Sequence, residues 1–417
     1  MSTFRIKPNR PDTEKLKVDD MNPFDRQERI GWWNQDKLRE AKVLVIGAGA
    51  IGNETLKNLA MLGIGNILLC DMDTISVSNL SRTVLFRKAD AGKKKAETAA
   101  QRVKEMCLEE SSRVDFFDGD IVWELGTGVY RYFDIVLGCL DNIETRFAVN
   151  KNCQLVAKPF IDAGISELAC SVSVFGINEG ACYQCFADKE QMNSARKRYS
   201  CDNFKKRMFG ERRMSTVQIS SAIVSALQVQ EAVKIITGKR AAISKKLFFQ
   251  GTVNDFDIFD LQREEDCLAH ASYDSIIETP LTNAVKLRRF LNFVSQEDKS
   301  GKGAALDLRG DRDFLRSIKC ATCGKQTFFY KPVFRLFGDE VICSNCKKQD
   351  GERFVIGEYD YIPDFDMNCE DTLLDLTLEQ LGIPKLHIVT VRDTAGGYKH
   401  YELSGDVKNV MPNISNQ

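Results

Sequence analysis

The pattern of apolar and polar residues predicts a βαβ unit in the first part of the chain. Residues 41–46 form a short apolar run that ends at Gly47, and residues 66–70 form a second apolar run. Between these runs, residues 54–62 carry apolar side chains at the spacing of a helix. Strands that alternate with helices in this way predict an α/β fold, in which a mainly parallel sheet has helices on both faces.

Later apolar runs are predicted to extend this sheet. Residues 133–139, 160–163 and 171–175 are predicted as strands. Residues 215–237 return to helical periodicity and stop before Gly238, a residue that commonly ends helices.

A small polar linker divides the chain into two parts. Residues 298–303 read Asp-Lys-Ser-Gly-Lys-Gly, which is typical of a domain boundary. This interpretation gives an N-terminal arm at 1–21, a domain at 22–297 and a C-terminal module at 304–417. Within the domain, residues 186–214 are rich in Lys, Arg and Asp and are interpreted as a segment that crosses it.

The C-terminal module is predicted to be a small α+β unit. Residues 376–384 are predicted as a short helix, and residues 386–391 and 399–403 as strands.

Composition and charge exclude several classes of function. The 417 residues are 43% hydrophobic and 28% charged, which is ordinary for a globular protein of more than one domain. A net charge of −1 gives no basic field for nucleic acid or for an anionic membrane. We find no apolar run near the roughly 18 residues that span a bilayer, and no signal-peptide core. We therefore expect a cytoplasmic protein with neither a nucleic-acid nor a membrane partner.

Fourteen cysteines are many for a reducing compartment, where closely spaced pairs indicate metal ligands rather than disulfides. Two Cys-x-x-Cys pairs have the spacing of a zinc ribbon at residues 320–346, with these ligands: Cys320, Cys323, Cys343 and Cys346. A second set of four could form another closed zinc site: Cys182, Cys185, Cys267 and His270. The alternative for this second set is that Cys267 and His270 are incidental.

A glycine-rich loop follows the first predicted strand and opens a helix. Gly47, Gly49 and Gly52 permit a tight turn and a close approach of the backbone, while the helix N-terminus offers N–H groups to phosphate. Asp71 and Asp73 follow after about 20 residues, where a carboxylate can bond a ribose hydroxyl. This arrangement is typical of a Rossmann-like nucleotide site, and by itself it also fits a dinucleotide oxidoreductase.

Charged residues after the later strands favour phosphate chemistry over hydride transfer. Arg82 follows the second strand, Lys95 opens a helix, and Asp141 with Asn142 follows a third strand. A hydride-transfer site needs no such ring of cations. Phosphoryl chemistry does, because negative charge develops on the α-phosphate during attack.

The ordered set of motifs in residues 47–86 resembles the adenylation domain of ubiquitin-activating enzymes. The same family includes the adenylyltransferases of molybdopterin and thiamine synthesis, and the similarity covers roughly residues 22–270. Ala50, Thr83 and Pro23 depart from residues that are frequent in the family, and none of these departures removes a catalytic charge.

The resemblance implies roles for these residues in binding ATP and Mg²⁺. Asp73 is expected to hold the ribose with support from Asp71, and Asp141 to bind Mg²⁺ beside Asn142. Residues expected to contact the triphosphate are Asn79, Arg82, Lys95 and, reaching across a homodimer, Arg26. The alternative for each charged residue is a solvated surface position. Arg146, one turn beyond Asp141, is interpreted as structural.

The reaction that this resemblance implies is the activation of a small ubiquitin-like or sulfur-carrier protein that ends in glycine. Its C-terminal carboxylate attacks the α-phosphate of ATP and pyrophosphate leaves. No general base is needed, since a carboxylate is already ionised near neutral pH. Positioning and charge neutralisation then supply the catalysis.

Cys201 decides between two versions of this function. In relatives, the cysteine that takes the carrier as a thioester lies in the same general region. Six flanking cations would favour its thiolate: Arg196, Lys197, Arg198, Lys205, Lys206 and Arg207. The alternatives are a dispensable loop cysteine or a further metal ligand. In the second version, a sulfur-carrier adenylyltransferase stops at the acyl-adenylate and does not need this thiol.

Two further alternatives concern partners. The C-terminal module is similar to the domain with which ubiquitin-activating enzymes recruit a conjugating enzyme, although dimerisation or carrier docking is equally consistent with its sequence. A non-catalytic subunit of the same fold would bind a partner without chemistry. Such a subunit would be expected to have lost Arg82, Lys95 and Asp141, which are present.

Overall fold

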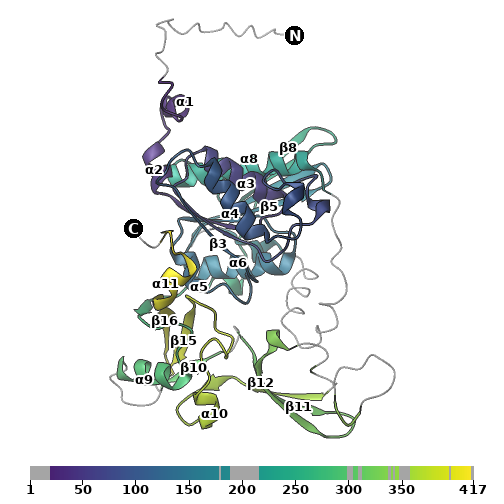
Figure 1. The fold of residues 1–417 in the computed structure, drawn as a ribbon, viewed down its shortest axis with the longest axis vertical. Helices are drawn as coiled ribbons and strands as arrows, with labels where there is room; N and C mark the ends of the chain where they lie inside the picture. Colours follow the sequence, from purple (N-terminus) through teal and green to yellow (C-terminus); the bar gives the residue numbers. More distant parts are fainter. Residues whose placement is uncertain are drawn as a thin grey trace, which may run out of the picture.

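The computed structural model describes most of the chain outside the N-terminal residues and the crossing segment. The described ranges are 19–177, 180–187, 216–297, 304–308, 312–336, 340, 343–346, 357–393 and 396–414. They form one large sheet with helices above and below it, and a C-terminal module with two smaller sheets (Figure 1).

The large sheet has eight strands in the order β3-β2-β1-β4-β5-β6-β7-β8. Strands β1 to β5 pair in parallel, and β6, β7 and β8 continue the sheet antiparallel. Their bounds are β1 Lys42–Ile46, β2 Asn66–Cys70, β3 Arg113–Phe117, β4 Ile135–Gly138, β5 Phe160–Ser166, β6 Ala169–Phe175, β7 Lys245–Gln250 and β8 Asp255–Asp260. The predicted α/β class with a mainly parallel sheet is confirmed.

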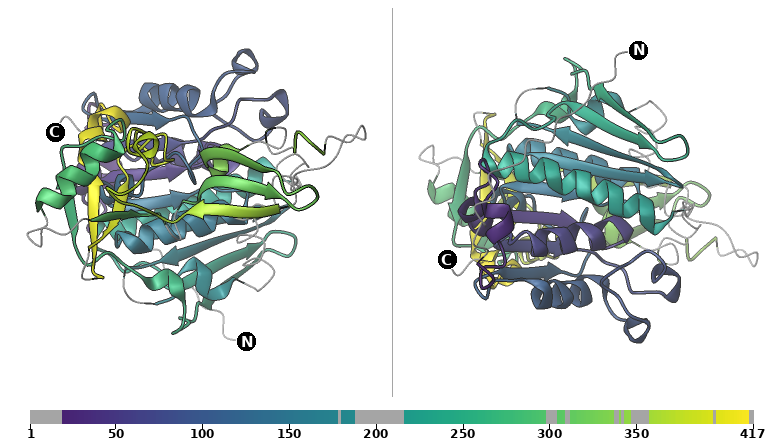
Figure 2. Two further views of the ribbon diagram at one scale, coloured as in Figure 1. Left: turned by 90° about the horizontal axis from the view of Figure 1, so that it is seen from below. Right: turned by 90° about the horizontal axis from the view of Figure 1, so that it is seen from above.

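Alternate residues of the central strands face two separate cores. In β1, Val43 and Val45 pack into the core above the sheet, while Leu44 and Ile46 pack into the core below it. The upper core contains side chains of α3 (Ala50–Met61), α4 (Lys95–Met106) and α8 (Gln218–Thr237), and the lower core those of α5 (Thr127–Arg131) and α6 (Ile143–Leu155). Burial on both faces explains why the parallel strands are continuous apolar runs. Figure 2 shows the upper helices from above.

Helix α8 differs from the expectation that no apolar run approaches the length that spans a bilayer. Its 20 residues are long and apolar enough to cross a membrane by length and composition alone. Half of its most apolar window is buried in the protein, and Val224, Val229 and Val233 belong to the upper core. Helix α8 packs against both the sheet and α3, so it is apolar because it is a core helix.

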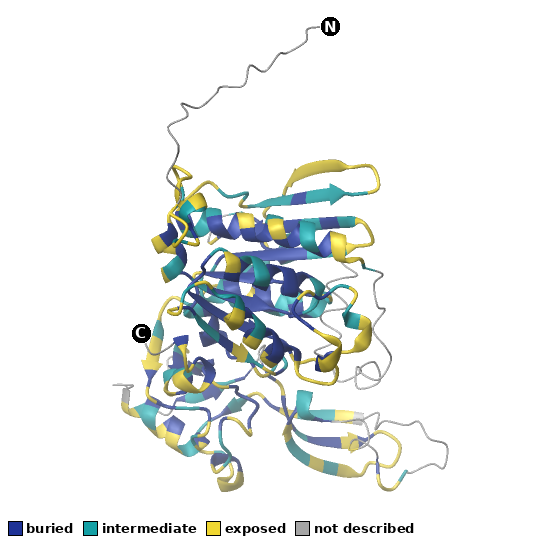
Figure 3. Cartoon of the chain, turned by 45° about the horizontal axis from the view of Figure 1, so that its top comes forward, coloured by how far each residue is buried: buried dark blue, intermediate teal, exposed yellow. Residues whose placement is uncertain are grey.

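The exposed edge of the large sheet is β8, whose six residues are all solvent-exposed, as Figure 3 shows in yellow at the top of the molecule. The core strands β1, β2 and β4 are buried along nearly their whole length.

The second sheet has five strands in the order β14-β10-β15-β16-β9. Its elements are β9 Ile276–Thr279, α9 Leu287–Glu297, β10 Ala305–Asp307, β14 Asp364–Phe365, α10 Asp371–Leu374, β15 Ile388–Arg392, β16 Tyr398–Leu403 and α11 Val407–Val410. Because β9 pairs with β16 and α9 packs in this core, residues 276–297 belong structurally with the C-terminal module. The domain boundary predicted at residue 297 therefore falls inside the C-terminal module of the structure and not at its beginning. The predicted helix at 376–384 is wrong: these residues form turns that bury Leu378 and Leu381.

The third sheet is a three-stranded antiparallel unit in the order β12-β11-β13. Its bounds are β11 Phe314–Cys320, β12 Gln326–Pro332 and β13 Gly357–Ile362. A small core of its own, which includes Leu315 and Ile318, lies beside the cysteines of the predicted ribbon.

The C-terminal module is joined to the large domain by buried polar contacts. Glu402 of β16 is fully buried and accepts hydrogen bonds from Arg131, the last residue of α5, at 2.5 Å and from Tyr132, which follows it, at 2.9 Å. The backbone N–H of Thr127 donates to Nδ1 of buried His387 at 3.2 Å. The module lies below the sheet, on the side covered by α5 and α6 (Figure 1).

Candidate active site

The glycine loop turns sharply at the carboxyl end of β1, where β1 and β4 lie side by side. Gly47 has φ +100°, and a side chain there would lie 2.4 Å from the carbonyl oxygen of Cys139, just after β4. A side chain at Gly52 would lie 1.9 Å from the carbonyl oxygen of Gly47. Gly49 is the N-cap of the 12-residue helix α3, so the first N–H groups of that helix face the loop. Glycine at 47 and 52 is therefore required by close packing.

Asp71 holds the loop in place from the end of the neighbouring strand β2. Its carboxylate accepts hydrogen bonds from the backbone N–H groups of Ala48 at 2.7 Å and Asp73 at 2.8 Å. Burial raises the pKa of the Asp71 carboxyl, and Lys95 together with the two N–H groups partly offsets this rise. Asp71 thus supports the turn, as the resemblance implied.

Asp73 and Lys95 form an ion pair at the edge of the site. Nζ of Lys95 lies 2.7 Å from a carboxylate oxygen of Asp73, and the backbone N–H of Lys95 donates to the carbonyl of Asp73 at 2.9 Å. The Lys95 side chain is only 11% exposed, whereas that of Asp73 is 56% exposed. The carboxylate therefore faces solvent and can meet a ribose, while the cation is fixed behind it.

Arg82 lies on a compact loop segment that leads from β2 to α4. The side chain of Asn79 accepts the backbone N–H of Ser76 at 3.0 Å, which fixes a short 3₁₀ turn, Val77–Asn79. The Arg82 guanidinium donates to the carbonyl of Ser78 at 2.8 Å. Among the described residues it forms no salt bridge, so its charge is available to a phosphate.

Asp141 and Asn142 follow β4, directly beside the glycine loop. Asn142 is the N-cap of α6: its side-chain oxygen accepts the N–H of Thr145 at 2.8 Å, and its amide donates to Asp141 at 3.2 Å. Asp141 is exposed, as a residue that holds a cation at a bound triphosphate must be.

Arg146 fixes the Asp141 loop from within the protein. Its guanidinium donates to the carbonyl of Leu140 at 2.7 Å and lies 3.1 Å from the carboxylate of Asp162 on β5. Burial raises the pKa of Asp162 to about 6, although the charge of Arg146 acts in the opposite direction. The structural interpretation of Arg146 agrees with these contacts.

Arg26 lies far from the site of its own chain. It belongs to the short helix α1 (Asp25–Glu28), which is anchored by Phe24 against Gly63, just before β2 begins. The site lies at the opposite ends of these strands, about 16 Å away for a five-residue strand. Arg26 is exposed and forms no salt bridge with the residues that the structure describes. The structure therefore does not bring Arg26 together with the other predicted site residues of the same chain.

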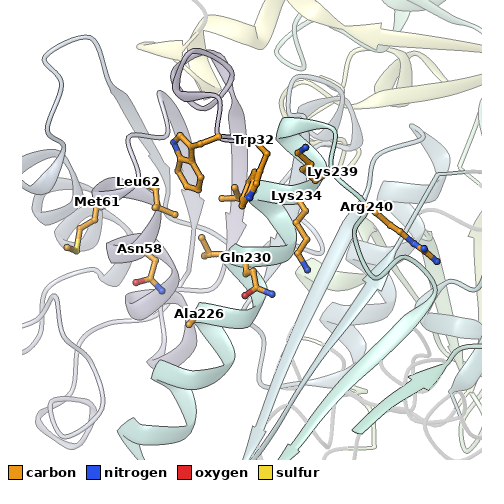
Figure 4. A pocket seen from close by; sticks show the side chains of 12 residues that line it. Trp32, Asn58, Met61, Leu62, Ala226, Gln230, Lys234, Lys239 and Arg240 are labelled. Carbon is orange, nitrogen blue, oxygen red and sulfur yellow. The ribbon is translucent and has the colours of Figure 1, made fainter. Parts of the chain in front are cut away.

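A groove of about 810 Å³ lies next to this N-terminal segment, between α3 and α8 (Figure 4). Its apolar floor includes Val229 and Val233, and its rim includes Trp32, which is 43% exposed, and the cations Lys239 and Arg240.

Cys201, the predicted thioester cysteine, lies outside the described residues, as does the crossing segment beyond its first two residues.

The structure brings both predicted sets of metal ligands together. In each set, the four ligand atoms lie within 4.8 Å of one another: Cys182, Cys185, Cys267 and His270; and Cys320, Cys323, Cys343 and Cys346. In the first set, Sγ of Cys182 is 3.8 Å from Sγ of Cys267, and in the second Cys323 is 3.6 Å from Cys343. A tetrahedral zinc with bonds of about 2.3 Å requires sulfur–sulfur distances of about 3.8 Å. Both donor sets therefore fit a closed zinc site.

Sequence reasoning missed two buried polar residues that support the site. Gln228 of α8 is fully buried and donates to the carbonyls of Gly138 at 3.0 Å and Ile161 at 2.9 Å. Asn53 of α3 is fully buried behind the glycine loop. Gln228 is a polar residue within an apolar helical stripe, and Asn53 lies within the motifs at residues 47–86 that carry the family resemblance, but neither signal assigned the residue a role.

The site as a whole defines a nucleotide-binding α/β protein with cations placed for phosphate. The chain belongs to the ThiF family, whose model matches residues 24–269.

Proteins similar to this chain include an activating-enzyme subunit and a sulfur-carrier adenylyltransferase. The chain is 39% identical to SUMO-activating enzyme subunit 2 of Dictyostelium discoideum over 38% of this chain and 24% of that protein. It is 31% identical to a sulfur carrier protein adenylyltransferase of Thermus thermophilus over 50% of this chain and 74% of that protein. The similarity thus spans only about a quarter of the SUMO-activating relative. A solved structure of the microcin C7 biosynthetic enzyme MccB shares the fold, with a TM-score of 0.50 and 23% identity over 61% of this chain and 77% of that chain.

The raised pKa of Asp162 predicts a pH dependence of stability. The folded chain keeps this proton up to about pH 6, whereas an unfolded aspartate releases it near 3.8. The stability of the wild type relative to Asp162→Asn should therefore fall by about 3 kcal/mol between about pH 4 and 6, at about 1.4 kcal/mol per pH unit, and stay constant above. Urea unfolding of the wild type and of Asp162→Asn at several pH values in this range measures the difference in their unfolding free energies. A relative stability that rises over the same range would show that Arg146, not burial, sets this pKa.

Proposed function

We propose that this chain binds Mg-ATP and adenylates the C-terminal carboxylate of a small ubiquitin-like or sulfur-carrier protein. One observation supports this above all: Arg82, Lys95 and exposed Asp141 lie on segments that follow β2 and β4, the strands on either side of β1, and the loop after β1 leaves no room for side chains at Gly47 and Gly52. Family membership and the named relatives, which include activating enzymes and adenylyltransferases, point to the same chemistry.

In the first step, a carboxylate oxygen of the carrier forms a bond to the α-phosphorus of ATP. The bond from that phosphorus to the bridging oxygen breaks, and pyrophosphate leaves with the electron pair. Arg82 and Lys95 neutralise the charge that develops, and the N–H groups at the start of α3 orient the phosphates. Asp141 would hold Mg²⁺, which supplies further neutralisation of the triphosphate.

In the second step, the thiolate of Cys201 attacks the acyl carbon and AMP leaves, which gives a carrier thioester. The similarity to SUMO-activating subunits favours this step. The similarity to sulfur-carrier adenylyltransferases favours the alternative, in which the reaction stops at the acyl-adenylate. If the thioester forms, the C-terminal module is the proposed docking site for a conjugating enzyme.

Intact-mass measurement separates these versions. The protein is mixed with Mg-ATP and a candidate carrier that ends in glycine, without reductant, and compared with Cys201→Ser. We expect a carrier-sized adduct that thiol reagents remove, absent from Cys201→Ser and retained in the control Cys369→Ser, whose thiol is half-buried in the C-terminal module.

Pyrophosphate release in the same samples tests adenylation itself. Arg82→Ala should lower its rate by about 100-fold or more. Release without an adduct in either protein would remove Cys201 as nucleophile and leave the sulfur-carrier version.

We further propose that the active form is a homodimer in which Arg26 of one protomer completes the site of the other. Arg26 lies at the far ends of the strands from its own site, so it can act only on a second chain. The apolar groove beside it, with exposed Trp32 and a rim of Lys239 and Arg240, is the surface that the second copy would cover.

Mixing two inactive variants tests this arrangement. Arg26→Ala and Asp141→Ala should each lose about 100-fold in pyrophosphate release. After they are unfolded and refolded together, half of the dimers contain one intact site, so about a quarter of the wild-type rate should return. If Arg26 acted within its own chain, mixing would restore nothing.

The two ligand clusters are proposed as structural zinc sites. The first joins Cys182 and Cys185, just before the crossing segment, to Cys267 and His270 at the end of the large domain. The second closes the three-stranded ribbon. Neither cluster lies at the nucleotide loop, so zinc is expected to stabilise the fold rather than to take part in the chemistry.

Metal analysis of the purified protein should find two zinc ions per chain. His270→Ala and Cys320→Ala should each retain one, because three ligands hold zinc far more weakly than four. His270→Cys should retain two, since a thiolate restores the fourth ligand. Two ions in His270→Ala would show that His270 is incidental.

A further inference from the structure

Asn53 connects the two parts of the nucleotide site. It lies on the first turns of α3 and is fully buried. Its side-chain amide donates to the carbonyls of Ala48 at 2.7 Å and Gly49 at 3.0 Å, both in the glycine loop. Its side-chain oxygen accepts the backbone N–H of Leu85 at 3.0 Å. One side chain therefore bonds to the glycine loop and to the segment that carries Arg82.

The segment on the Leu85 side is held closely enough to transmit this constraint. Leu85 is buried in the upper core, three residues after Arg82. The backbone N–H of Arg82 donates to the carbonyl of Asn79 at 3.0 Å, and the hydroxyl of Thr83 donates to the same carbonyl at 3.0 Å. A shift of Leu85 would therefore move Arg82 relative to the loop.

The chemistry of the amide suits this task. Both groups on the loop are carbonyl acceptors, and the group at Leu85 is a donor. Of the short side chains, only an amide offers two N–H donors and an acceptor together. Without Asn53, the carbonyls of Ala48 and Gly49 and the N–H of Leu85 would each lose one hydrogen bond. Such a loss is unfavourable for a backbone group that is shielded from water.

We propose that Asn53 is a positioning residue that sets the distance between the glycine loop and Arg82. Through it, the N–H groups of the loop and the Arg82 guanidinium act on the same triphosphate. This inference rests on the proposed ATP binding. It predicts that the contributions of Asn53 and Arg82 to ATP affinity are not independent.

A double-mutant cycle on the binding of Mg-ATP tests the proposal without any carrier protein. Calorimetric titration gives Kd for the wild type, Asn53→Ala, Arg82→Ala and the double variant. We expect Asn53→Ala to weaken binding about tenfold in the wild type but less than about threefold when Arg82 is already absent. Asn53→Ser, whose hydroxyl can donate to only one of the two loop carbonyls, should give an intermediate loss and guards against poor folding of the alanine variant.

Asn66 provides a matched control. It is also buried, and its amide also donates to two backbone carbonyls, those of Ala41 at 3.3 Å and Glu40 at 3.4 Å, but at the opposite ends of the strands. Asn66→Ala should lower the unfolding temperature and leave Kd for ATP unchanged. Equal losses from Asn53→Ala with and without Arg82 would overturn the positioning role. A wild-type protein that binds no ATP would instead refute the proposed function and this inference with it.

Discussion

The close approach of the loop after β1 to the end of β4 is the constraint on which the site depends. The carbonyl of Cys139 leaves no room for a side chain at Gly47, and the carbonyl of Gly47 leaves none at Gly52. At this point the chain connections leave the sheet in opposite directions, so loops from neighbouring strands can open around a ligand. The loop, the Asp73–Lys95 pair, Arg82 and Asp141 all reach the same edge for this reason. A polyanion bound there would meet backbone N–H groups and cations that are already in place.

That approach is maintained by buried polar groups rather than by apolar packing alone. Asp71 holds the loop from the end of β2, Asn53 holds it from α3, and Gln228 of α8 holds the end of β4 and the start of β5. Buried polar atoms are costly when unpaired, so each of these side chains is stable only in the position where all its partners are met.

The sequence predicted those features that depend on local pattern. Strand β2 occupies the predicted residues 66–70, because a strand buried on both faces is a continuous apolar run. Both sets of metal-ligating residues follow from ligand spacing, and His270 joins the first as predicted.

Features set by distant contacts were not predictable in this way. Strand β9 reads as part of the first domain until its partner β16, more than a hundred residues later, is known. Residues 376–384 have apolar spacing that suits a helix, yet Leu378 and Leu381 are buried from turns. The three partners of Asn53 likewise lie on two separate segments.

The attachment of the C-terminal module gives the proposed partner binding a physical basis. Glu402 has no exposed surface, and its carboxylate accepts hydrogen bonds from the side chains of Arg131, Tyr132 and Ser404. Without the two residues of the large domain, Ser404 would be the one side-chain partner left among the described residues. Leu386 of the module packs into the lower core of the large domain, and a side chain at Gly126 or Gly128 would collide with its backbone. Separating the two parts would expose this apolar surface and leave a buried charge unpaired, which is strongly unfavourable. A protein that docks on the module is therefore held at a defined position relative to the large domain, and the linker between the sheets does not have to provide that position.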